Sequence, residues 1–185
     1  MIAIIPNAWD NFTDLSKREQ GLQREKNDLT KLGLIPEVVD LRDFFGKPEI
    51  LRSKLSKYGG IWAVGGNTFV LRRAYHESGM DDWLKEQIGN REFVYAGYSA
   101  GICVLSPSLR GLETIDSPSV VGEGYPKETI WEGLGLIDFA IAPHYQSNHP
   151  ESDMVNDEVR YYENKGIKYR ALHDGEAIVM ETAEK

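Results

Sequence analysis

Short apolar runs alternate with longer amphipathic segments along this chain of 185 residues. A run of four to six apolar residues fits a buried strand, whereas apolar residues at helical spacing fit a helix packed on one face. Alternation of the two is typical of parallel strands joined by crossover helices. We therefore expect an α/β fold, a three-layer sandwich with a mostly parallel central sheet. The length suits a single domain over residues 1–185 with one buried core.

The expected strands are the apolar runs 1–5, 37–41, 60–64, 93–96, 136–142, 169–172 and 177–180. The expected helices cover residues 16–32, 49–57, 68–88 with a break near Gly79, 99–105 and 151–164. Ser16 and Glu19 have the spacing of a capping box, and Gly33 is placed to end that first helix.

The formal net charge of −8 argues against nucleic acid or an anionic membrane as the main partner. The densest basic pairs, Lys17-Arg18 and Arg72-Arg73, are expected on solvated helix surfaces. No segment approaches the length of a membrane span, and the amino terminus has no basic region followed by a long apolar run. The single cysteine, Cys103, cannot form an internal disulfide. We expect a cytoplasmic protein.

The strongest local signal is the segment FVYAGYSAGI at residues 93–102, an apolar strand that runs into Gly-x-Ser-x-Gly and then into a helix-compatible stretch. That layout is typical of a nucleophile elbow, in which a tight turn presents one hydroxyl above the sheet edge. Ser99 is the candidate nucleophile, and the N–H of Ala100 is the first candidate oxyanion donor. The five-residue motif is weak alone, so its support comes from the preceding strand.

A second glycine turn, Gly65-Gly66-Asn67, follows another expected strand and would place one more N–H near the same sheet edge. Glycine lets such an N–H point into a site with no side chain in the way. The alternative is phosphate binding, but the turn lacks the later glycine of the dinucleotide fingerprint.

Functional residues of open parallel sheets gather at the carboxyl ends of the strands. His144 directly follows the expected strand 136–142 and is the best candidate for a base that would activate Ser99. His173, after a later strand, is a weaker one. The acid that would orient the base is one of four residues in loops or near strand ends: Glu113, Asp116, Glu123 and Asp174.

No metal or other cofactor is expected, because one cysteine and four dispersed histidines give no convincing ligand spacing. A loop metal shared by His144 and His149 is the alternative.

Four motifs together resemble the peptidase E family of serine dipeptidases, relatives of cyanophycinase. They are Gly65-Gly66-Asn67-Thr68-Phe69-x-Leu71, Ala96-Gly97-Tyr98-Ser99-Ala100-Gly101, Asp116-Ser117-Pro118 and Pro143-His144-Tyr145. The resemblance runs from about Met1 to Met180 and implies a fold like that of class I glutamine amidotransferases. It implies Ser99 as nucleophile, His144 as base and Asp116 as orienting acid. The oxyanion donors would be Ala100 and either Gly65 or Gly66, and the substrate a small peptide.

The chain departs from the family pattern in two places. An arginine is expected on the helix after the histidine loop to bind a substrate aspartate, but Asp153 stands there and the first basic residue of the helix is Arg160. An anion in place of a cation makes strict Asp-X specificity doubtful. The chain also begins at what resembles the family's second strand, which would expose the Met1 strand at a sheet edge or leave it to a homodimer partner.

Two other functions stay open at this point. The elbow does not choose between amide and ester, so an esterase or another acyl hydrolase is one alternative. A non-catalytic binding domain on an amidotransferase-like scaffold is the other, and the intact Ser99, His144 and Asp116 argue against it.

Overall fold

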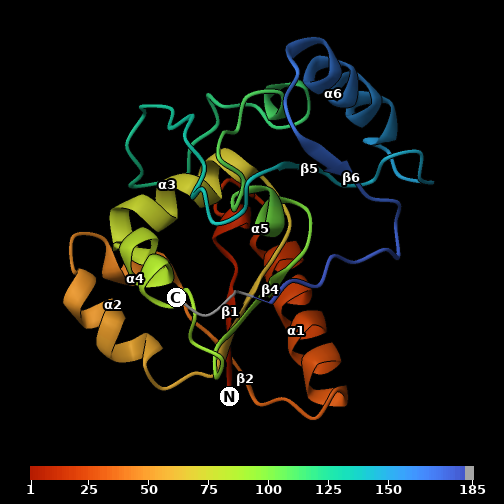
Figure 1. Cartoon of the computed structure of the whole chain (residues 1–185). Coiled ribbons are helices and arrows are strands. Elements are labelled where there is room, and N and C mark those ends of the chain that lie inside the picture. The colour runs from red at the N-terminus through yellow and green to blue at the C-terminus, as the bar shows by residue number, and fades with distance from the viewer. Residues whose placement is uncertain (182–185) are drawn as a thin grey trace.

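The computed structural model describes residues 1–181, and its main sheet is parallel with the strand order β2-β1-β3-β4 (Figure 1). The four strands are β1 (Ile2–Ile5), β2 (Pro36–Val38), β3 (Gly60–Ala63) and β4 (Val94–Gly97). β1 is buried along its whole length, as its apolar sequence predicts. All four strands run the same way, so their carboxyl ends meet at one edge of the sheet.

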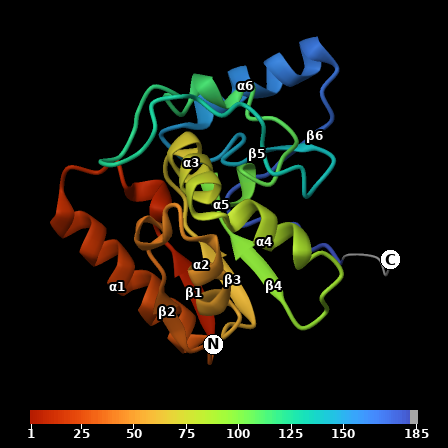
Figure 2. The ribbon, with the colours of Figure 1, turned by 90° about the vertical axis from the view of Figure 1, so that its left-hand side faces the viewer.

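Helices cover both faces of this sheet, which gives the expected three layers. In Figures 1 and 2, α1 lies on one face and α2, α3 and α4 lie on the other. Their bounds are α1 (Leu15–Lys31), α2 (Pro48–Leu55), α3 (Thr68–Ser78) and α4 (Met80–Glu86). The expected break near Gly79 is confirmed: this residue has φ +80°, a left-handed conformation that ends one helix before the next begins.

A second, smaller layer of strands lies beyond the carboxyl ends of the main sheet (Figure 1). It consists of β5 (Ala140–Ala142) and β6 (Tyr169–Ala171), a parallel pair connected through α6 (Ser152–Lys165). The expected continuation of one sheet is therefore wrong at this point, because β5 pairs with β6 and not with β4. The expected strand at 177–180 is also wrong: that segment is irregular, and Val179 is 89% exposed.

The strand at the amino terminus is not an edge. Ala3 of β1 is in register with Glu37 of β2 on one side and with Ile61 of β3 on the other. The prediction that the Met1 strand is either exposed at a sheet edge or left to a partner subunit is thus wrong, because β2 already pairs with it.

The first helix is capped differently from the prediction. The Asp14 carboxylate accepts hydrogen bonds from the N–H groups of Ser16 and Lys17, so Asp14 and not Ser16 is the N-cap. Helical geometry therefore starts at Leu15, one residue before the expected start.

Arg72 and Arg73 on α3 are buried, contrary to the prediction of a solvated pair. Arg73 donates to the backbone carbonyls of Pro118 and Glu128 at 2.7 and 2.8 Å, and Arg72 forms an ion pair with Asp81. These bonds fasten the long irregular segment that follows η3 (Leu112–Thr114) to the main sheet layer.

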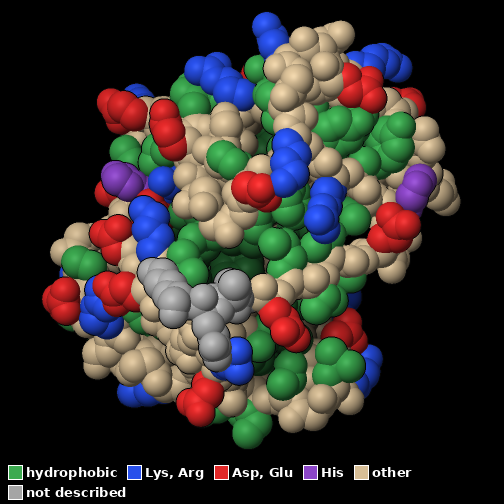
Figure 3. Space-filling model, viewed as in Figure 1, with side chains coloured by type: hydrophobic (Ala, Val, Ile, Leu, Met, Phe, Trp, Pro, Cys, Tyr) green, Lys and Arg blue, Asp and Glu red, His purple; other side chains and the backbone are tan. Residues whose placement is uncertain are grey.

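Basic and acidic side chains are interspersed on the face shown in Figure 3, with no basic patch there. Among the described residues 1–181, no helix is both long enough and apolar enough to span a membrane.

Candidate active site

The expected elbow is present at the end of β4. Ser99 has φ +48° and ψ −121°, an uncommon backbone conformation for a residue with a side chain, and α5 (Ala100–Cys103) starts directly after it. A Cβ at Gly97 or Gly101 would lie 2.5 or 2.2 Å from the carbonyl oxygen of Ala63. The two motif glycines are thus required because the elbow packs backbone against backbone on β3.

Ser99 opens into a pocket of about 520 Å³ at the carboxyl ends of the main strands. The pocket lining comes from four parts of the chain that are distant in sequence: Trp9, Asn11, Phe12, Lys17, Gly21 and Arg24; Gly65, Gly66, Asn67, Tyr98 and Ser99; Ile115, Asp116, Ser117 and Val120; and His144, His149 and Glu151. Ser99, His144 and Asp116, which the sequence analysis singled out separately, therefore face one cavity.

Backbone N–H groups without an acceptor lie near the serine. Among the described residues 1–181, the N–H of Gly66 donates to no backbone acceptor, whereas the N–H of Gly65 faces the Tyr98 hydroxyl. The N–H of Ala100, in the first turn of α5, has no partner within its helix. Gly66 has φ +137°, and a Cβ there would lie 2.6 Å from the carbonyl oxygen of Ala8. The glycine turn thus brings a free donor, the Gly66 N–H, close to the elbow, as an oxyanion site needs.

Asn67, the third residue of that turn, has a structural role as a helix cap. Its side-chain oxygen accepts from the N–H of Val70 at 2.9 Å and caps α3, while its amide donates to the Ser117 carbonyl at 3.2 Å. The residue joins the glycine turn to the loop that carries Asp116.

His144 is held by an acid that the family resemblance does not assign to it. Its Nδ1 lies 2.6 Å from Oδ1 of Asp174, just beyond β6. The N–H of Asp174 in turn donates to the Ser147 hydroxyl at 2.8 Å. His144 has φ +62°, a strained conformation that the turn after β5 imposes. The His144 side chain is 18% exposed and that of Asp174 is 46% exposed.

Asp116 lies in the pocket but is bonded elsewhere. Its Oδ2 accepts from the N–H of Thr68 at 2.7 Å. Burial raises the pKa of its carboxyl to about 6, against the lowering effect of the bonds from Thr68. The hydrogen bond of Asp116 goes to the start of α3, whereas Asp174 occupies the imidazole Nδ1, so the geometry favours Asp174 over Asp116 as the acid on His144.

The remaining candidates do not reach the pocket. Glu113 accepts from the N–H of Gly111, and Glu123 is exposed. His173 is exposed, and its ring lies 5.9 Å from that of Tyr145. Among the described residues no partner hydrogen-bonds the Ser99 hydroxyl, and catalytic hydrogen bonds commonly tighten only when substrate binds.

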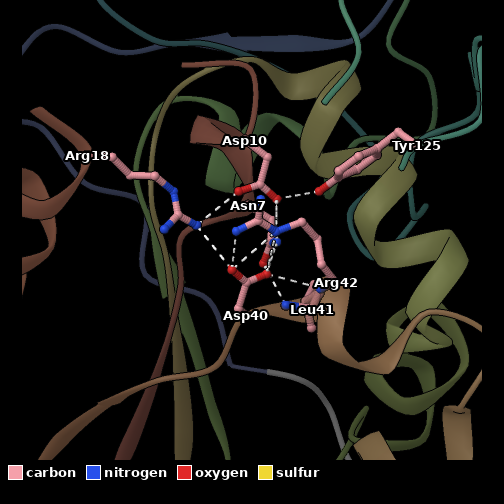
Figure 4. Close-up of polar contacts among 7 residues, drawn as sticks. All are labelled: Asn7, Asp10, Arg18, Asp40, Leu41, Arg42 and Tyr125. Atoms are coloured by element: carbon pink, nitrogen blue, oxygen red, sulfur yellow. Dashed lines mark hydrogen bonds and ion pairs between the residues drawn. The ribbon is translucent and has the colours of Figure 1, made fainter. Parts of the chain in front are cut away.

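The wall formed by residues 9–24 was missed from the sequence, although Asn7 at the end of β1 pointed to that edge. A network of hydrogen bonds and ion pairs around Asn7, Asp10 and Asp40 holds this wall in place (Figure 4). Asp10, whose side chain is fully buried, accepts from Asn7, Arg18 and Tyr125. Asn7 also donates to Asp40 at 3.0 Å and accepts from the N–H of Leu41 at 3.1 Å. The network ties α1 and the start of η2 (Leu41–Phe44) to the loop that presents Trp9 and Phe12.

Tyr98, the residue before the nucleophile, is fixed in the same way. Its hydroxyl donates to Glu25 of α1 at 3.0 Å, and Trp62 of β3 donates to the other oxygen of Glu25 at 2.8 Å. Burial and the nearby Glu25 raise the Tyr98 pKa. The ring is therefore a neutral, rigid part of the pocket wall.

The two charged residues that the sequence analysis compared with the family pattern lie outside the pocket. Asp153 is exposed and does not line the pocket, and Arg160 pairs with Asp157 on the outer face of α6. Neither can meet a substrate beside Ser99. The cations of this pocket are instead Lys17 and Arg24, both on α1.

One group in the pocket has donor atoms that suit a metal. His149 stacks on His144 with ring centroids 3.8 Å apart and planes 9° apart. One ligand atom from each of His144, His149 and Glu151 lies within 4.8 Å of the others.

Comparisons with known proteins identify relatives of this chain. An uncharacterized peptidase of Listeria innocua is 31% identical over 159 residues, which cover 86% of this chain and 72% of that protein. A probable alpha-aspartyl dipeptidase of Drosophila melanogaster is 39% identical over 85 residues, 46% of this chain and 32% of that protein. A crystal structure from Listeria monocytogenes EGD-e, assigned to peptidase E, superposes with a TM-score of 0.72 at 24% identity and covers 99% of this chain and 86% of that one.

The crystal structure confirms the expected fold. The profile of peptidase family S51 matches the whole chain, residues 1–185. The resemblance to the peptidase E family is thereby confirmed, and the chain belongs to peptidase family S51 and is a serine peptidase.

Proposed function

We propose that this protein is a dipeptidase that cleaves short peptides with a free amino terminus, through Ser99, His144 and Asp174. The observation that carries the proposal is the shared pocket: the elbow serine and a histidine fixed by a carboxylate face the same cavity. The dipeptidase name of the Drosophila relative supports the substrate class.

The proposed reaction is acyl transfer. His144 takes the proton of the Ser99 hydroxyl as the oxygen attacks the peptide carbonyl, and the N–H groups of Ala100 and of Gly65 or Gly66 stabilise the oxyanion. The C–N bond breaks as His144 protonates the leaving amine. Water then attacks the acyl-enzyme with His144 again as base, and the free Ser99 hydroxyl is restored. Asp174 holds the imidazole with Nδ1–H directed at its carboxylate, so that Nε2 can accept the proton.

The charges of the pocket support a short substrate. Asp116 lies on one wall, where its carboxylate can pair with the ammonium group of a free amino terminus. Lys17 and Arg24 lie on the α1 wall, where they can pair with a carboxylate at the other end of the peptide. A cavity with an anion and cations on different walls favours a zwitterion such as a dipeptide over a long neutral segment.

Specificity for an amino-terminal aspartate stays a separate question, because Asp116 and Glu151 are the acids of this pocket and Arg160 points away from it. We expect dipeptides with neutral first residues to be cleaved at least as well as Asp-X dipeptides.

The test is hydrolysis of a dipeptide panel with acidic, neutral and basic first residues, by the wild type and by Ser99→Ala. A fluorophosphonate label read by intact mass reports on the serine independently of the substrate. We expect cleavage and labelling by the wild type and neither by Ser99→Ala. Labelling together with ester hydrolysis but no cleavage of any dipeptide would favour the esterase alternative and overturn the dipeptidase proposal.

A further inference from the structure

A group of three nitrogen and oxygen donors lies on the rim of the pocket beside the nucleophile. His144 and His149 are stacked, and Glu151 begins the turn that leads into α6. His149 and Glu151 are partly exposed, with side-chain exposures of 32% and 38%. The catalytic mechanism proposed above uses neither His149 nor Glu151.

We propose that His144, His149 and Glu151 form a zinc site, and that zinc bound there blocks the base of the peptidase. Two histidines and one carboxylate are a ligand set that Zn²⁺ accepts, with a water molecule as the fourth ligand. Imidazole nitrogens favour Zn²⁺ over Mg²⁺ or Ca²⁺, which prefer oxygen donors.

The spacing fits after the His149 ring turns out of its stack on His144. The three ligand atoms lie within 4.8 Å of one another. A tetrahedral zinc ion at about 2.1 Å from each ligand needs ligand atoms about 3.4 Å apart. Because the stacked rings direct their lone pairs in parallel, the His149 ring must rotate to share an ion with His144. His149 and Glu151 are partly exposed and lie just before α6, so this adjustment falls on side chains and leaves the strands in place.

A second observation points to a metal ligand. Asp174 accepts from His144 Nδ1 at 2.6 Å, which directs Nε2 away from Asp174 and fixes the ring. Metal-binding histidines commonly have such a carboxylate on the other ring nitrogen, and it raises the basicity of the ligating nitrogen. The same Asp174 would thus serve the base in the free enzyme and the ligand in the zinc form.

Zinc binding would change the activity because the zinc ion and the Ser99 proton need the same atom, Nε2 of His144. A zinc ion on Nε2 of His144 occupies the lone pair that would take the proton of Ser99. We therefore expect zinc to inhibit peptide hydrolysis and a chelator to restore it. This consequence rests on the proposed function, whereas zinc binding does not.

Binding is measured first, with Co²⁺ as a coloured substitute for Zn²⁺ on the full chain. We expect visible absorption bands of four-coordinate Co²⁺ that vanish when Zn²⁺ is added. His149→Gln and Glu151→Gln should each weaken zinc binding at least tenfold. His173→Gln, which removes a nearby exposed histidine outside the group, is the matched control and should bind like the wild type.

Ser99→Ala separates the two proposals, because it removes the nucleophile and leaves all three zinc ligands. We expect it to bind zinc as tightly as the wild type. Absence of Co²⁺ bands in the wild type, or equal zinc affinity in His149→Gln, would overturn the zinc site. A failure to cleave peptides, with zinc binding intact, would instead count against the proposed function alone.

Discussion

The two sides of the pocket are built differently. Ser99 is fixed by backbone packing, since the glycines around it lie against the Ala63 carbonyl of β3 and leave no room for a methyl group. His144 and Asp174 follow two three-residue strands, and the bonds that hold them run through side chains: Asp174 to His144, and the Asp174 N–H to the Ser147 hydroxyl.

This difference in construction determines how each side of the pocket responds to a substitution. Backbone packed against backbone cannot yield to an added atom without a shift of whole strands. A chain of partly exposed side-chain hydrogen bonds can lose one member and retain much of its geometry. We expect substitutions on the Ser99 side to disturb folding and activity together, and those on the His144 side to lower activity by an amount that depends on the bond removed while the fold is retained.

The largest combined effect on stability and activity is expected for Gly101→Ala. The new methyl group would lie 2.2 Å from the Ala63 oxygen, so β3 or the elbow must move. We expect hydrolysis to fall at least a hundredfold and the free energy of unfolding to fall by about 3 kcal/mol. Gly59→Ala is the control, because its methyl group would meet only the Glu92 oxygen at 3.7 Å. Activity within threefold of the wild type in Gly101→Ala would show that the elbow is not held by backbone packing.

The second largest effect is expected on stability and concerns Glu158. This residue is buried on α6 and does not line the pocket. Its Oε1 accepts from Tyr162 at 2.6 Å, and burial raises the carboxyl pKa to about 8. The folded state therefore holds a proton that the unfolded state has released, so stability falls as pH rises from about 4.5 to 8.

We expect the free energy of unfolding of the wild type to fall by about 2–4 kcal/mol between pH 5 and pH 9. In Glu158→Gln, which has no proton to lose at this position, most of that fall should be absent. Chemical denaturation at the two pH values measures this, with Asp157→Asn on the exposed face of α6 as control. An equal pH dependence in wild type and Glu158→Gln would mean that the carboxyl is not neutral in the folded protein.

A smaller effect is expected for Ser147→Ala, which removes the hydroxyl that accepts from Asp174 N–H and donates to the Tyr145 carbonyl. We expect kcat to fall about fivefold with KM unchanged, because one neutral hydrogen bond contributes about 1 kcal/mol to placing Asp174. Steady-state kinetics on one dipeptide measure both constants. A change in KM alone would place Ser147 in substrate binding and not in positioning.

The smallest effect is expected on the α1 wall. Lys17 and Arg24 are exposed, so their attraction for a substrate carboxylate is screened by water and salt. We expect Lys17→Ala and Arg24→Ala each to raise KM about threefold at low salt, and the difference to vanish at high salt or with a carboxy-amidated dipeptide. Lys31→Ala, on α1 but outside the pocket lining, should leave KM unchanged.

The sequence predicted the Ser99 side well, because its residues are adjacent in the chain and their backbone requirements appear as glycines. Apolar runs and glycine turns reflect local geometry, and the elbow and the turn at Gly65-Gly66 were both found where expected. The strands of the main sheet were predicted, but the separation of β5 and β6 into a second sheet was not. The periodicity of apolar residues indicates a strand but does not say which strands pair.

The acid on His144 could not be chosen from its four candidates, because Asp174 and His144 are thirty residues apart and meet only through the pairing of β5 with β6. Asp116 stood in the more suggestive motif and does enter the pocket, but its bond to Thr68 appears only in three dimensions. The buried pair Arg72-Arg73 was mistaken for a solvated one for the same reason, since its acceptors are carbonyls of a distant loop.

The most direct test of the proposed catalytic group is a comparison of Asp174→Asn with Asp116→Asn, in which kcat and KM are measured on a dipeptide with a free amino terminus. We expect Asp174→Asn to lower kcat by about 10² to 10⁴ with KM nearly unchanged, because the imidazole loses its orienting carboxylate. We expect Asp116→Asn to raise KM about tenfold and to retain most of kcat, since it loses a charge that meets the substrate ammonium. The reverse pattern, a collapse of kcat in Asp116→Asn and near-normal kcat in Asp174→Asn, would contradict the assignment of Asp174 to His144.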